Sequence, residues 1–301
     1  MQEDQLRFEQ ALNLLPQRLR QSLQSLSPQQ KAFAEELRLR LGQPIAILTP
    51  WGEWSAEGTE ALVREEDLQS VYLRAAQYSA YTVSDTVSQG FLPAEGGFRV
   101  GLCGRAVLRD GEVFNIRQFS SMAIRIPREK KGIAQPLLES LPREGVFPST
   151  LILSPPGGGK TTLLRDMVRL LAEGDPECRV GLVDERGEIA CAVSGVNQMD
   201  VGRRTDVLTG CPKAKGIEML LRTMNPKIIA VDEITRPADL EAMTLAANCG
   251  VSLLATIHAA DVSELRCKPL FEKLLQCKVF HKAVVIRRRE GERCYDWEEL
   301  E

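Results

Sequence analysis

A glycine-rich segment in the middle of the chain has the residue types that bind polyphosphates. Residues 151–162 read LILSPPGGGKTT. Gly157, Gly158 and Gly159 carry no Cβ atoms, so backbone amides at a helix N-terminus can surround a clustered negative charge. Lys160 follows the last glycine and is placed to reach the β- and γ-phosphates of a nucleotide. The segment therefore predicts a P-loop.

The neighbours of these residues complete the predicted site. Pro156 opens the turn, the hydroxyl of Thr161 is placed to ligate Mg²⁺, and Thr162 continues into an apolar helical pattern. The usual P-loop pattern begins with glycine, whereas Ser154 stands at that position here. A glycine-rich surface turn before a helix is the alternative. A predicted buried strand before the loop favours ATP and Mg²⁺ binding.

A pair of acids ends another apolar run, KIIAVDE, at residues 227–233. Ligands gather at the carboxyl ends of parallel strands, so acids in this position are where such an enzyme holds magnesium and water. We expect Asp232 to hold Mg²⁺, directly or through water. Glu233 would orient or deprotonate the attacking water. The alternative is that the two acids only belong to the N-terminal end of the helix that begins at Pro237 and have no catalytic role.

Two further strands are predicted to end in polar residues. His258 follows the buried strand at 251–257, and with Thr256 it is either a sensor of the γ-phosphate or a structural hydrogen-bonding residue. Glu185 follows the apolar run at 179–184 and is a second candidate for the catalytic base. Glu233 is preferred.

The amino-acid composition narrows the class of protein to which this chain can belong. A chain of 301 residues with 44% hydrophobic and 26% charged residues is typical of a globular protein of two domains. The net charge of −3 and an aromatic content of 5% do not favour nucleic acid as a partner. None of the eight cysteines forms a C-x-x-C pair, which argues against zinc. Cys103 and Cys249 are expected to be reduced core thiols.

The N-terminus gives an expectation about location. It reads MQEDQLRFEQ, which is acidic and polar, and no run of about eighteen apolar residues occurs in the chain. We therefore expect neither a signal peptide nor a membrane span, and we expect a cytosolic protein.

Hydrophobic periodicity predicts an α/β fold with three regions. Residues 1–127 form a smaller α+β domain, residues 128–145 a charged linker and a leading helix, and residues 146–301 a P-loop ATPase domain. In the last region apolar strands alternate with helices, which predicts a mostly parallel sheet. Residues 195–210 are expected to form an ordered loop near the site.

The first region is predicted to begin with helices and to continue as a small antiparallel sheet. A helix is expected to start at Ser27 and Pro28 and to run through Leu41, and another to cover residues 62–81. The Asp-Gly pair at residues 110–111 lies between apolar runs and predicts a hairpin.

Four arginines lie on or beside the strands of this sheet: Arg99, Arg105, Arg117 and Arg125. The favoured interpretation of any one of them is a solvent-facing position on a half-buried strand. The alternative is that some of them reach a phosphate across a domain or subunit interface, as arginine fingers do.

The order of these motifs resembles that of a known superfamily. Residues 221–261, LRTMNPKIIAVDEITRPADLEAMTLAANCGVSLLATIHAAD, are similar to the Walker B and histidine boxes of the secretion-superfamily ATPases of type II and type IV secretion and pilus systems. Residues 179–188 are similar to the aspartate box of these ATPases. GFRVGLCGRAV, SPPGGGKTTLLRD with its serine, VDERGEIA and ATIHAAD resemble, more closely still, the stage III sporulation AA family of endospore formers.

The resemblance implies a RecA-like ATPase in the cytoplasm of the mother cell. It would be peripheral to the outer forespore membrane and docked on a membrane-embedded channel between mother cell and forespore. The implied partner is stage III sporulation protein AB, and the implied assembly is a hexamer with ATP between subunits. In such rings the N-terminal domain supplies arginines to the nucleotide, which favours a phosphate role for some of the four. The alternative function is a nucleotide-binding structural ring subunit with little turnover.

Overall fold

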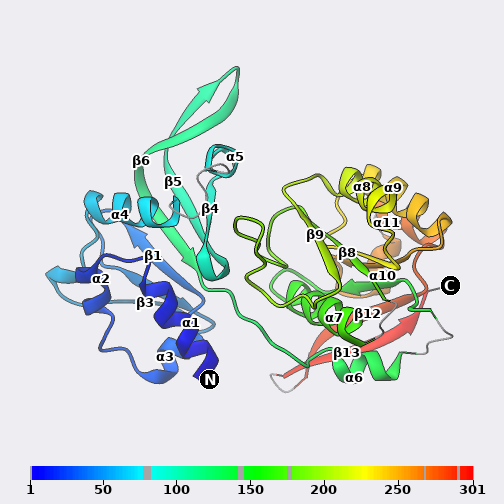
Figure 1. Cartoon of the computed structure of the whole chain (residues 1–301). Coiled ribbons are helices and arrows are strands. Elements are labelled where there is room, and N and C mark those ends of the chain that lie inside the picture. The colour runs from blue at the N-terminus through cyan, green and yellow to red at the C-terminus, as the bar shows by residue number, and fades with distance from the viewer. Residues whose placement is uncertain are drawn as a thin grey trace. The chain divides into compact units, whose positions relative to one another are not determined.

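The chain folds into two compact units in a computed structural model that describes residues 2–76, 83–141, 146–174, 178–267, 269–289 and 292–300 (Figure 1). Unit 1 comprises Met1–Arg128 together with Cys191–Gln198. Unit 2 comprises Glu129–Ala190 together with Met199–Glu301. A short segment from the second half of the sequence thus belongs to unit 1.

Unit 1 is built on a six-stranded sheet in the order β3-β2-β1-β6-β5-β4, in which all neighbours are antiparallel. Its strands are β1 Glu36–Arg40, β2 Ala46–Thr49, β3 Gly52–Ser55, β4 Phe91–Ala94, β5 Phe98–Arg109 and β6 Glu112–Arg125. Asp110 and Gly111 join β5 to β6 with φ values of 53° and 86°. Positive φ at both central residues matches the twist of a two-residue hairpin, so the predicted hairpin is confirmed.

Helices cover one face of this sheet. They are α1 Gln2–Leu12, α2 Gln17–Ser22, α3 Pro28–Phe33, α4 Glu65–Ala76 and α5 Val83–Ser88, with short 3-10 turns at Thr59–Ala61 and Glu95–Gly97. Phe8, Leu19 and Leu68 of the helices are fully buried in one cluster with Leu37 and Ile124 of the strands. Residues 77–81, the end of the predicted helix 62–81, lie outside the described residues.

The prediction of a helix through Leu41 is wrong beyond α3. Ser27 caps α3 as expected, because its hydroxyl accepts the Gln30 N–H and its own N–H donates to the Gln30 side chain. Leu37 and Leu39 alternate with arginines in β1, which lies between β2 and β6. This period of two belongs to a strand with one buried face.

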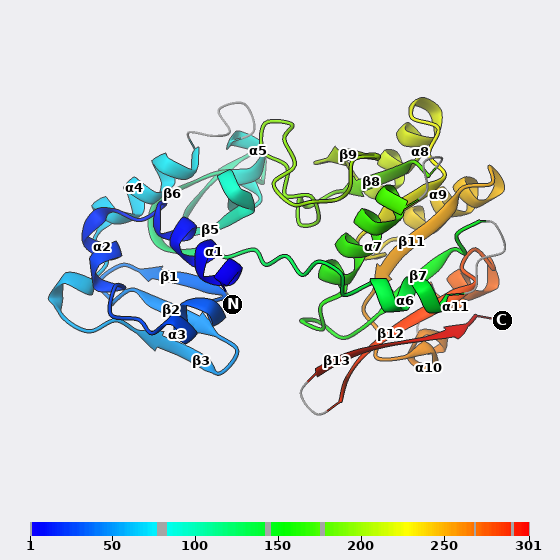
Figure 2. The same cartoon turned by 60° about the horizontal axis from the view of Figure 1, so that its bottom comes forward.

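Unit 2 contains a seven-stranded sheet in the order β13-β12-β7-β11-β10-β8-β9 (Figure 2). The strands are β7 Thr150–Leu153, β8 Val180–Asp184, β9 Thr205–Thr209, β10 Ile228–Val231, β11 Ser252–Ile257, β12 Lys282–Arg289 and β13 Glu292–Glu299. Six of them are parallel, and β13 pairs antiparallel with β12. The predicted mostly parallel sheet is confirmed, whereas the predicted loop over 195–210 contains the edge strand β9.

Helices cover both faces of the unit 2 sheet. They are α6 Gln135–Ser140, α7 Lys160–Gly174, α8 Lys213–Thr223, α9 Pro237–Asn248, α10 Val262–Arg266 and α11 Pro269–Gln276. Ile152 of β7 is buried with residues of α6 and α7. Leu151 and Leu153 are buried on the other side with residues of α8 and α9. This alternation fixes which sheet face carries α7.

The charged run after residue 128 is tied to unit 2. Lys131 Nζ lies 2.7 Å from Asp200 Oδ2, and the Asp200 N–H donates to Glu129 Oε1 at 2.8 Å. The buried carboxylate of Asp166 accepts the Gly132 N–H at 3.0 Å. From Glu129 onward the chain is therefore held by α7 and by the loop before β9.

Two other features of the described residues bear on the expectations. Cys103 and Cys249 are exposed rather than buried, because Cys103 alternates with the core residue Leu102 on β5 and Cys249 caps the end of α9. The expectation of core thiols is wrong for both. No helix in the described ranges is both long enough and apolar enough to cross a membrane.

Candidate functional site

The glycine-rich loop of residues 154–159 joins β7 to α7 at the carboxyl edge of the unit 2 sheet. Gly157 and Gly159 have φ values of 73° and 101°, a region that residues with a Cβ rarely adopt. Gly158 is required for another reason: a Cβ there would lie 1.6 Å from Ser154 Oγ. Ser154 is only 1% exposed, so its side chain fills the space beneath Gly158. Pro156 is exposed on the loop.

The contact between Ser154 and Gly158 can be tested by a double-variant cycle. We expect Gly158→Ala to lower the free energy of unfolding by about 1–3 kcal/mol, because the added methyl group overpacks a closed site. Ser154→Gly removes both side-chain atoms that the methyl group would meet, so the variant carrying both changes should recover most of this loss. Chemical denaturation followed by circular dichroism measures the four proteins. Equal destabilisation of the single and double variants would contradict the packing argument.

Lys160 is buried at the first turn of α7. Its Nζ donates to Ser154 O at 2.8 Å and to Pro155 O at 3.2 Å, and lies 2.7 Å from Nδ1 of His258. Burial lowers the pKa of Lys160, while the negative charges of Asp232 and Glu233 act in the opposite direction. The ammonium is thus held by carbonyl oxygens within the loop, where a phosphate can replace them as its partner.

Asp232 links the start of α7 to two neighbouring strands. Thr161 Oγ1 donates to Asp232 Oδ2 at 3.0 Å, and Thr256 Oγ1 donates to Asp232 Oδ1 at 2.6 Å. The same Thr256 hydroxyl accepts the Glu233 N–H at 2.8 Å. Strand β10 therefore presents its acid pair to the loop in a position fixed by β11, its parallel neighbour.

Glu233 and His258 lie together beside Lys160. His258 Nε2 is 2.9 Å from Glu233 Oε1, and Arg186 Nη1 donates to Glu233 Oε2 at 3.3 Å. With Nδ1 accepting from Lys160, the proton of a neutral His258 lies on Nε2 and points at Glu233. Glu233 has a φ of 41°, which is strained for a residue with a Cβ. Residues with such backbone strain cluster at functional sites.

Asp184 and Glu185, at the end of β8, have different surroundings. Asp184 is 1% exposed and its carboxylate accepts the N–H groups of Glu188, Ile189 and Ala190. Burial raises the pKa of Asp184, and these hydrogen bonds partly offset that rise. Glu185 forms an ion pair with the buried Lys213. Asp184 therefore holds the backbone of the loop after β8, and the carboxylate of Glu185 is already paired with Lys213.

The donor set suits magnesium. Thr161 and Asp232 offer a hydroxyl and a carboxylate oxygen 3.0 Å apart, and Mg²⁺ prefers oxygen ligands combined with waters and substrate phosphates. Thr162 follows Thr161 on α7 and is partly exposed. No group of three or more His, Cys, Asp or Glu side chains that could hold a metal ion occurs in the described part of the chain.

The four arginines named from the sequence form two cross-strand pairs in unit 1. Arg99 lies opposite Arg125, and Arg105 lies opposite Arg117. The guanidinium carbon of Arg99 is 3.8 Å from the ring centroid of Phe91. Arg125 Nε donates to Glu36 at 3.3 Å. The first pair therefore has contacts within the sheet.

The second pair lies where β5 and β6 continue as a two-stranded ribbon. The last pairing of β4 is with Gly101 and that of β1 is with Ser121, so Arg105 and Arg117 lie beyond both strands (Figure 1). A register shift at Gly104 precedes them, and a Cβ on Gly104 would lie 2.7 Å from Arg117 O. Both arginines are exposed, and no ion pair or hydrogen bond joins either side chain to another described residue. Like charges facing each other are unfavourable unless an anion lies between them.

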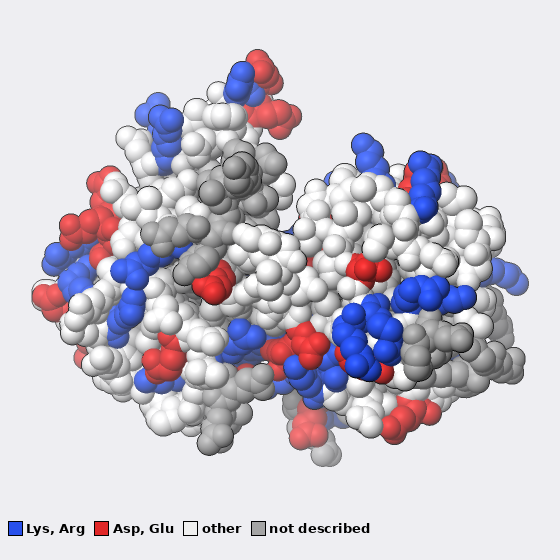
Figure 3. Space-filling view, viewed as in Figure 1, with Lys and Arg blue, Asp and Glu red and all other residues white. Residues whose placement is uncertain are grey.

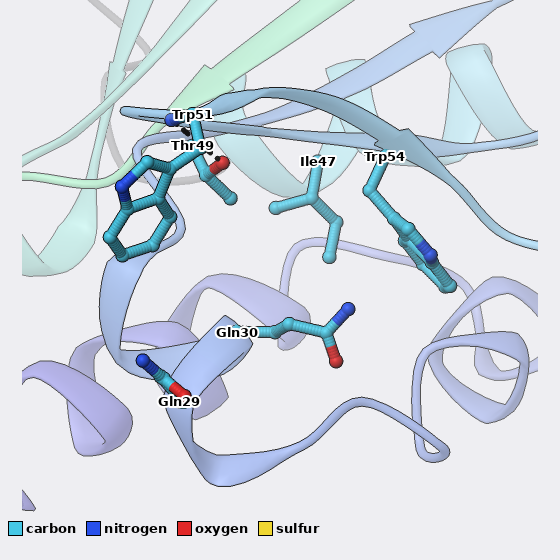
Figure 4. A pocket seen from close by; sticks show the side chains of 6 residues that line it. All are labelled: Gln29, Gln30, Ile47, Thr49, Trp51 and Trp54. Atoms are coloured by element: carbon cyan, nitrogen blue, oxygen red, sulfur yellow. Dashed lines mark hydrogen bonds between the residues drawn. The ribbon is translucent and has the colours of Figure 1, made fainter.

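Unit 1 also has a pocket that lacks chemistry of this kind (Figure 4). Its volume is about 350 Å³, and its lining contains no ionisable residue: Gln29, Gln30, Ile47, Thr49, Trp51 and Trp54. In Figure 4, Gln30 of α3 and Ile47 of β2 approach each other from opposite walls. A pocket without cations is unsuited to polyphosphate.

Sequence reasoning missed several residues that build the site. Arg165 of α7 donates to the backbone oxygens of Glu188 and Ile189, at 2.7 Å and 2.6 Å, and so holds the loop after β8. Arg186 contacts Glu233, and its position next to the acids of residues 184–185 was the available signal. Lys213 gave no signal, because an isolated lysine at a helix start is ordinarily exposed.

Solved structures of secretion ATPases share this fold. The pilus retraction motor PilT with bound ADP has a TM-score of 0.60 at 16% identity, with 89% of this chain and 79% of that chain covered. The ATPase DotB of Legionella pneumophila has a TM-score of 0.57 at 16% identity, covering 89% and 77%. The predicted RecA-like ATPase fold is therefore confirmed.

Sequence comparison identifies the family. The family model described as sporulation stage III, protein AA, matches residues 5–294. The stage III sporulation protein AA of Bacillus subtilis (strain 168) is 37% identical over 283 residues, which cover 92% of this chain and 90% of that protein. Both matches extend across the two units, and the chain therefore belongs to the stage III sporulation protein AA family, whose fold is that of the secretion ATPases.

Proposed function

We propose that this chain is an ATP hydrolase that uses Mg²⁺. One observation carries the proposal: Lys160, Thr161, Asp232, Glu233 and His258 come from three separate elements of unit 2 and are joined at the carboxyl edge of one sheet by hydrogen bonds of 3.0 Å or less. Phosphoryl transfer needs positioning and charge stabilisation rather than covalent chemistry, and these groups supply both.

The residues divide the work as follows. The amides of residues 157–161 and the Lys160 ammonium bind the phosphates, and Thr161 with Asp232 holds Mg²⁺, which neutralises charge on the phosphates when bound. Glu233 orients the attacking water and accepts its proton. His258 contacts both Lys160 and Glu233. When Lys160 binds a γ-phosphate, His258 would lose its contact with the lysine and keep the one with Glu233, so that it senses the γ-phosphate. Glu185 is the second candidate base, and its ion pair with Lys213 makes its carboxylate less available.

The wider proposal concerns assembly and location. Family membership supports a role in building or powering a sporulation channel between mother cell and forespore, from the mother-cell cytoplasm at the outer forespore membrane. Stage III sporulation protein AB is the proposed membrane partner, and a hexamer with ATP between subunits is the proposed assembly. Figure 3 shows acidic and basic side chains interspersed on the face in view, which gives no support to nucleic acid as a partner.

Arg105 and Arg117 are the proposed arginines that reach the nucleotide of a neighbouring subunit. We expect Arg117→Ala to lower ATP hydrolysis by the assembled ring about 10-fold, because one charge of the pair remains near the transferred phosphate. The ADP affinity of dilute, unassembled protein should not change.

Arg109→Ala on the same ribbon is the matched control, since the Arg109 guanidinium lies over the Phe114 ring, 5.6 Å from its centroid. Phosphate release by oligomer and monomer fractions measures the effect. Unchanged hydrolysis in Arg117→Ala and in Arg105→Ala would remove both residues from this role.

The alternative function is a ring subunit that binds nucleotide and turns it over little. The burial of Lys160 among loop carbonyls is compatible with it, since binding alone uses that residue. Phosphate release by the wild type and by Glu233→Gln, with ATP bound and the membrane partner present, separates the two functions. Equal inertness of the two proteins leaves only the structural role.

A further inference from the structure

The β12–β13 hairpin carries arginines to the carboxyl edge of the sheet. β12 runs parallel to β7, and Val285 lies opposite Leu153, the last residue of β7. Residues 287–289, all arginine and all exposed, therefore continue past β7 on the edge where the glycine-rich loop begins. Figure 2 shows β13 returning along β12 as the outermost strand of the sheet.

One arginine of this hairpin touches the glycine-rich loop. A Cβ on Gly159 would lie 3.1 Å from both Cζ and Nε of Arg293 and 3.4 Å from its Nη1. The guanidinium therefore lies against the residue that immediately precedes Lys160. Arg293 is exposed at the start of β13 and belongs to unit 2, as the loop does.

In the part of the chain that the structure describes, the arginines on one face of the hairpin have a carboxylate partner, and those on the other face do not. Arg287 and Arg289 both donate to Asp296 Oδ2, at 3.2 Å and 2.8 Å. Arg288 and Arg293 face each other across the strands, and among the described residues no carboxylate is bonded to either. A pair of like charges directly opposite each other is unfavourable in isolation.

The unneutralised pair lies on the face that carries α7. Along β12, Val284 and Ile286 pack in the same buried cluster as Ile152 of β7, and Arg288 follows them at the spacing of two. Tyr295 and Trp297 of β13 are partly buried against that cluster, so the strand that bears Arg293 is fixed to the core.

We propose that Arg293 binds a phosphate of the nucleotide held by its own subunit. The proposal rests on the proposed function and adds a binding residue to it. The planar guanidinium offers several N–H donors and can bind two phosphate oxygens at once. Its contact at Gly159 brings this charge next to the glycine-rich loop, one residue before Lys160. Arg288 adds positive potential from the opposite strand.

Nucleotide affinity of full-length protein tests the proposal without a need for turnover. ADP, ATP and adenosine binding are measured by calorimetry at 0.15 M salt, where charges more than about 8 Å apart are largely screened. We expect Arg293→Ala to weaken ADP and ATP binding about 10-fold and to leave adenosine binding within 2-fold. Arg293→Lys should recover part of the loss, because it keeps the charge and loses the bidentate geometry.

Arg289→Ala is the matched control, since it removes the same charge from the opposite face of the same hairpin. It should keep ADP affinity within 2-fold of the wild type. ADP affinity of Arg293→Ala within 2-fold of the wild type, or an equal loss of adenosine and ADP binding, would overturn the proposal.

Lys160→Ala distinguishes this failure from a failure of the proposed function. If the wild type binds ADP, Lys160→Ala binds it about 100-fold more weakly and Arg293→Ala binds it like the wild type, only the role of Arg293 is lost. If the wild type binds no nucleotide, the proposed function and the role of Arg293 are both lost.

Discussion

Lys160→Ala should bind ATP and ADP about 100-fold more weakly than the wild type, a loss of about 2.7 kcal/mol. The residue is 6% exposed, and its ammonium is held within the loop by two carbonyl oxygens and by His258. Hydrogen bonds to charged groups contribute about 1.5–3 kcal/mol each, and this ammonium would donate one to the β-phosphate, which ATP and ADP share. Calorimetric titration with ADP measures the loss.

Controls for Lys160→Ala must distinguish a loss of nucleotide binding from a loss of folding. Removal of the buried ammonium takes a donor from the carbonyl oxygens of Ser154 and Pro155, although Pro155 O keeps the Gly158 N–H and the Ser154 hydroxyl. Lys160→Met, which keeps most of the apolar stem, should therefore accompany the alanine variant. Lys215→Ala removes an exposed lysine from the same unit and should bind like the wild type. If folded Lys160→Ala and Lys160→Met both bind ADP within 2-fold of the wild type, the loop does not bind phosphates through this lysine.

The parts of the site that the sequence predicts are those encoded over a few adjacent residues. A run of apolar residues followed by polar ones marks the end of a buried strand, and parallel strands end at one edge. On that ground Lys160, Asp232, Glu233 and His258 could be expected to meet, and the structure joins them by hydrogen bonds. That expectation did not require the order of the strands in the sheet.

The parts that the sequence does not predict depend on pairing between distant segments. β1 has only five residues, and the helical spacing of apolar residues that begins in α3 continues into it. Its pairing with β6, far along the chain, decides that it is a strand. Arg293 reaches Gly159 only because β12 pairs with β7 and β13 with β12. Ser154 departs from the usual motif, and only the space beneath Gly158 explains it.

Glu233→Gln should bind ATP like the wild type and hydrolyse it about 10³-fold more slowly. A positioned general base contributes about 10²- to 10⁴-fold, and the amide cannot accept the proton of the attacking water. The side-chain carbonyl of glutamine can still accept from His258 Nε2, so the geometry around the site should be kept. Single-turnover phosphate release with the membrane partner present measures the rate, and calorimetry measures the affinity.

Glu185→Gln is the matched comparison, because it makes the same change at the end of the neighbouring parallel strand β8. The carboxylate of Glu185 is paired with Lys213, whereas that of Glu233 contacts His258, which in turn contacts the lysine of the glycine-rich loop. Glu185→Gln should therefore lose less than about 10-fold, since its effect on the base is indirect. A reversed order, with Glu185→Gln inactive and Glu233→Gln active, would move the base to β8. That result would leave Lys160 and Asp232 in their roles, because neither depends on which carboxylate receives the proton.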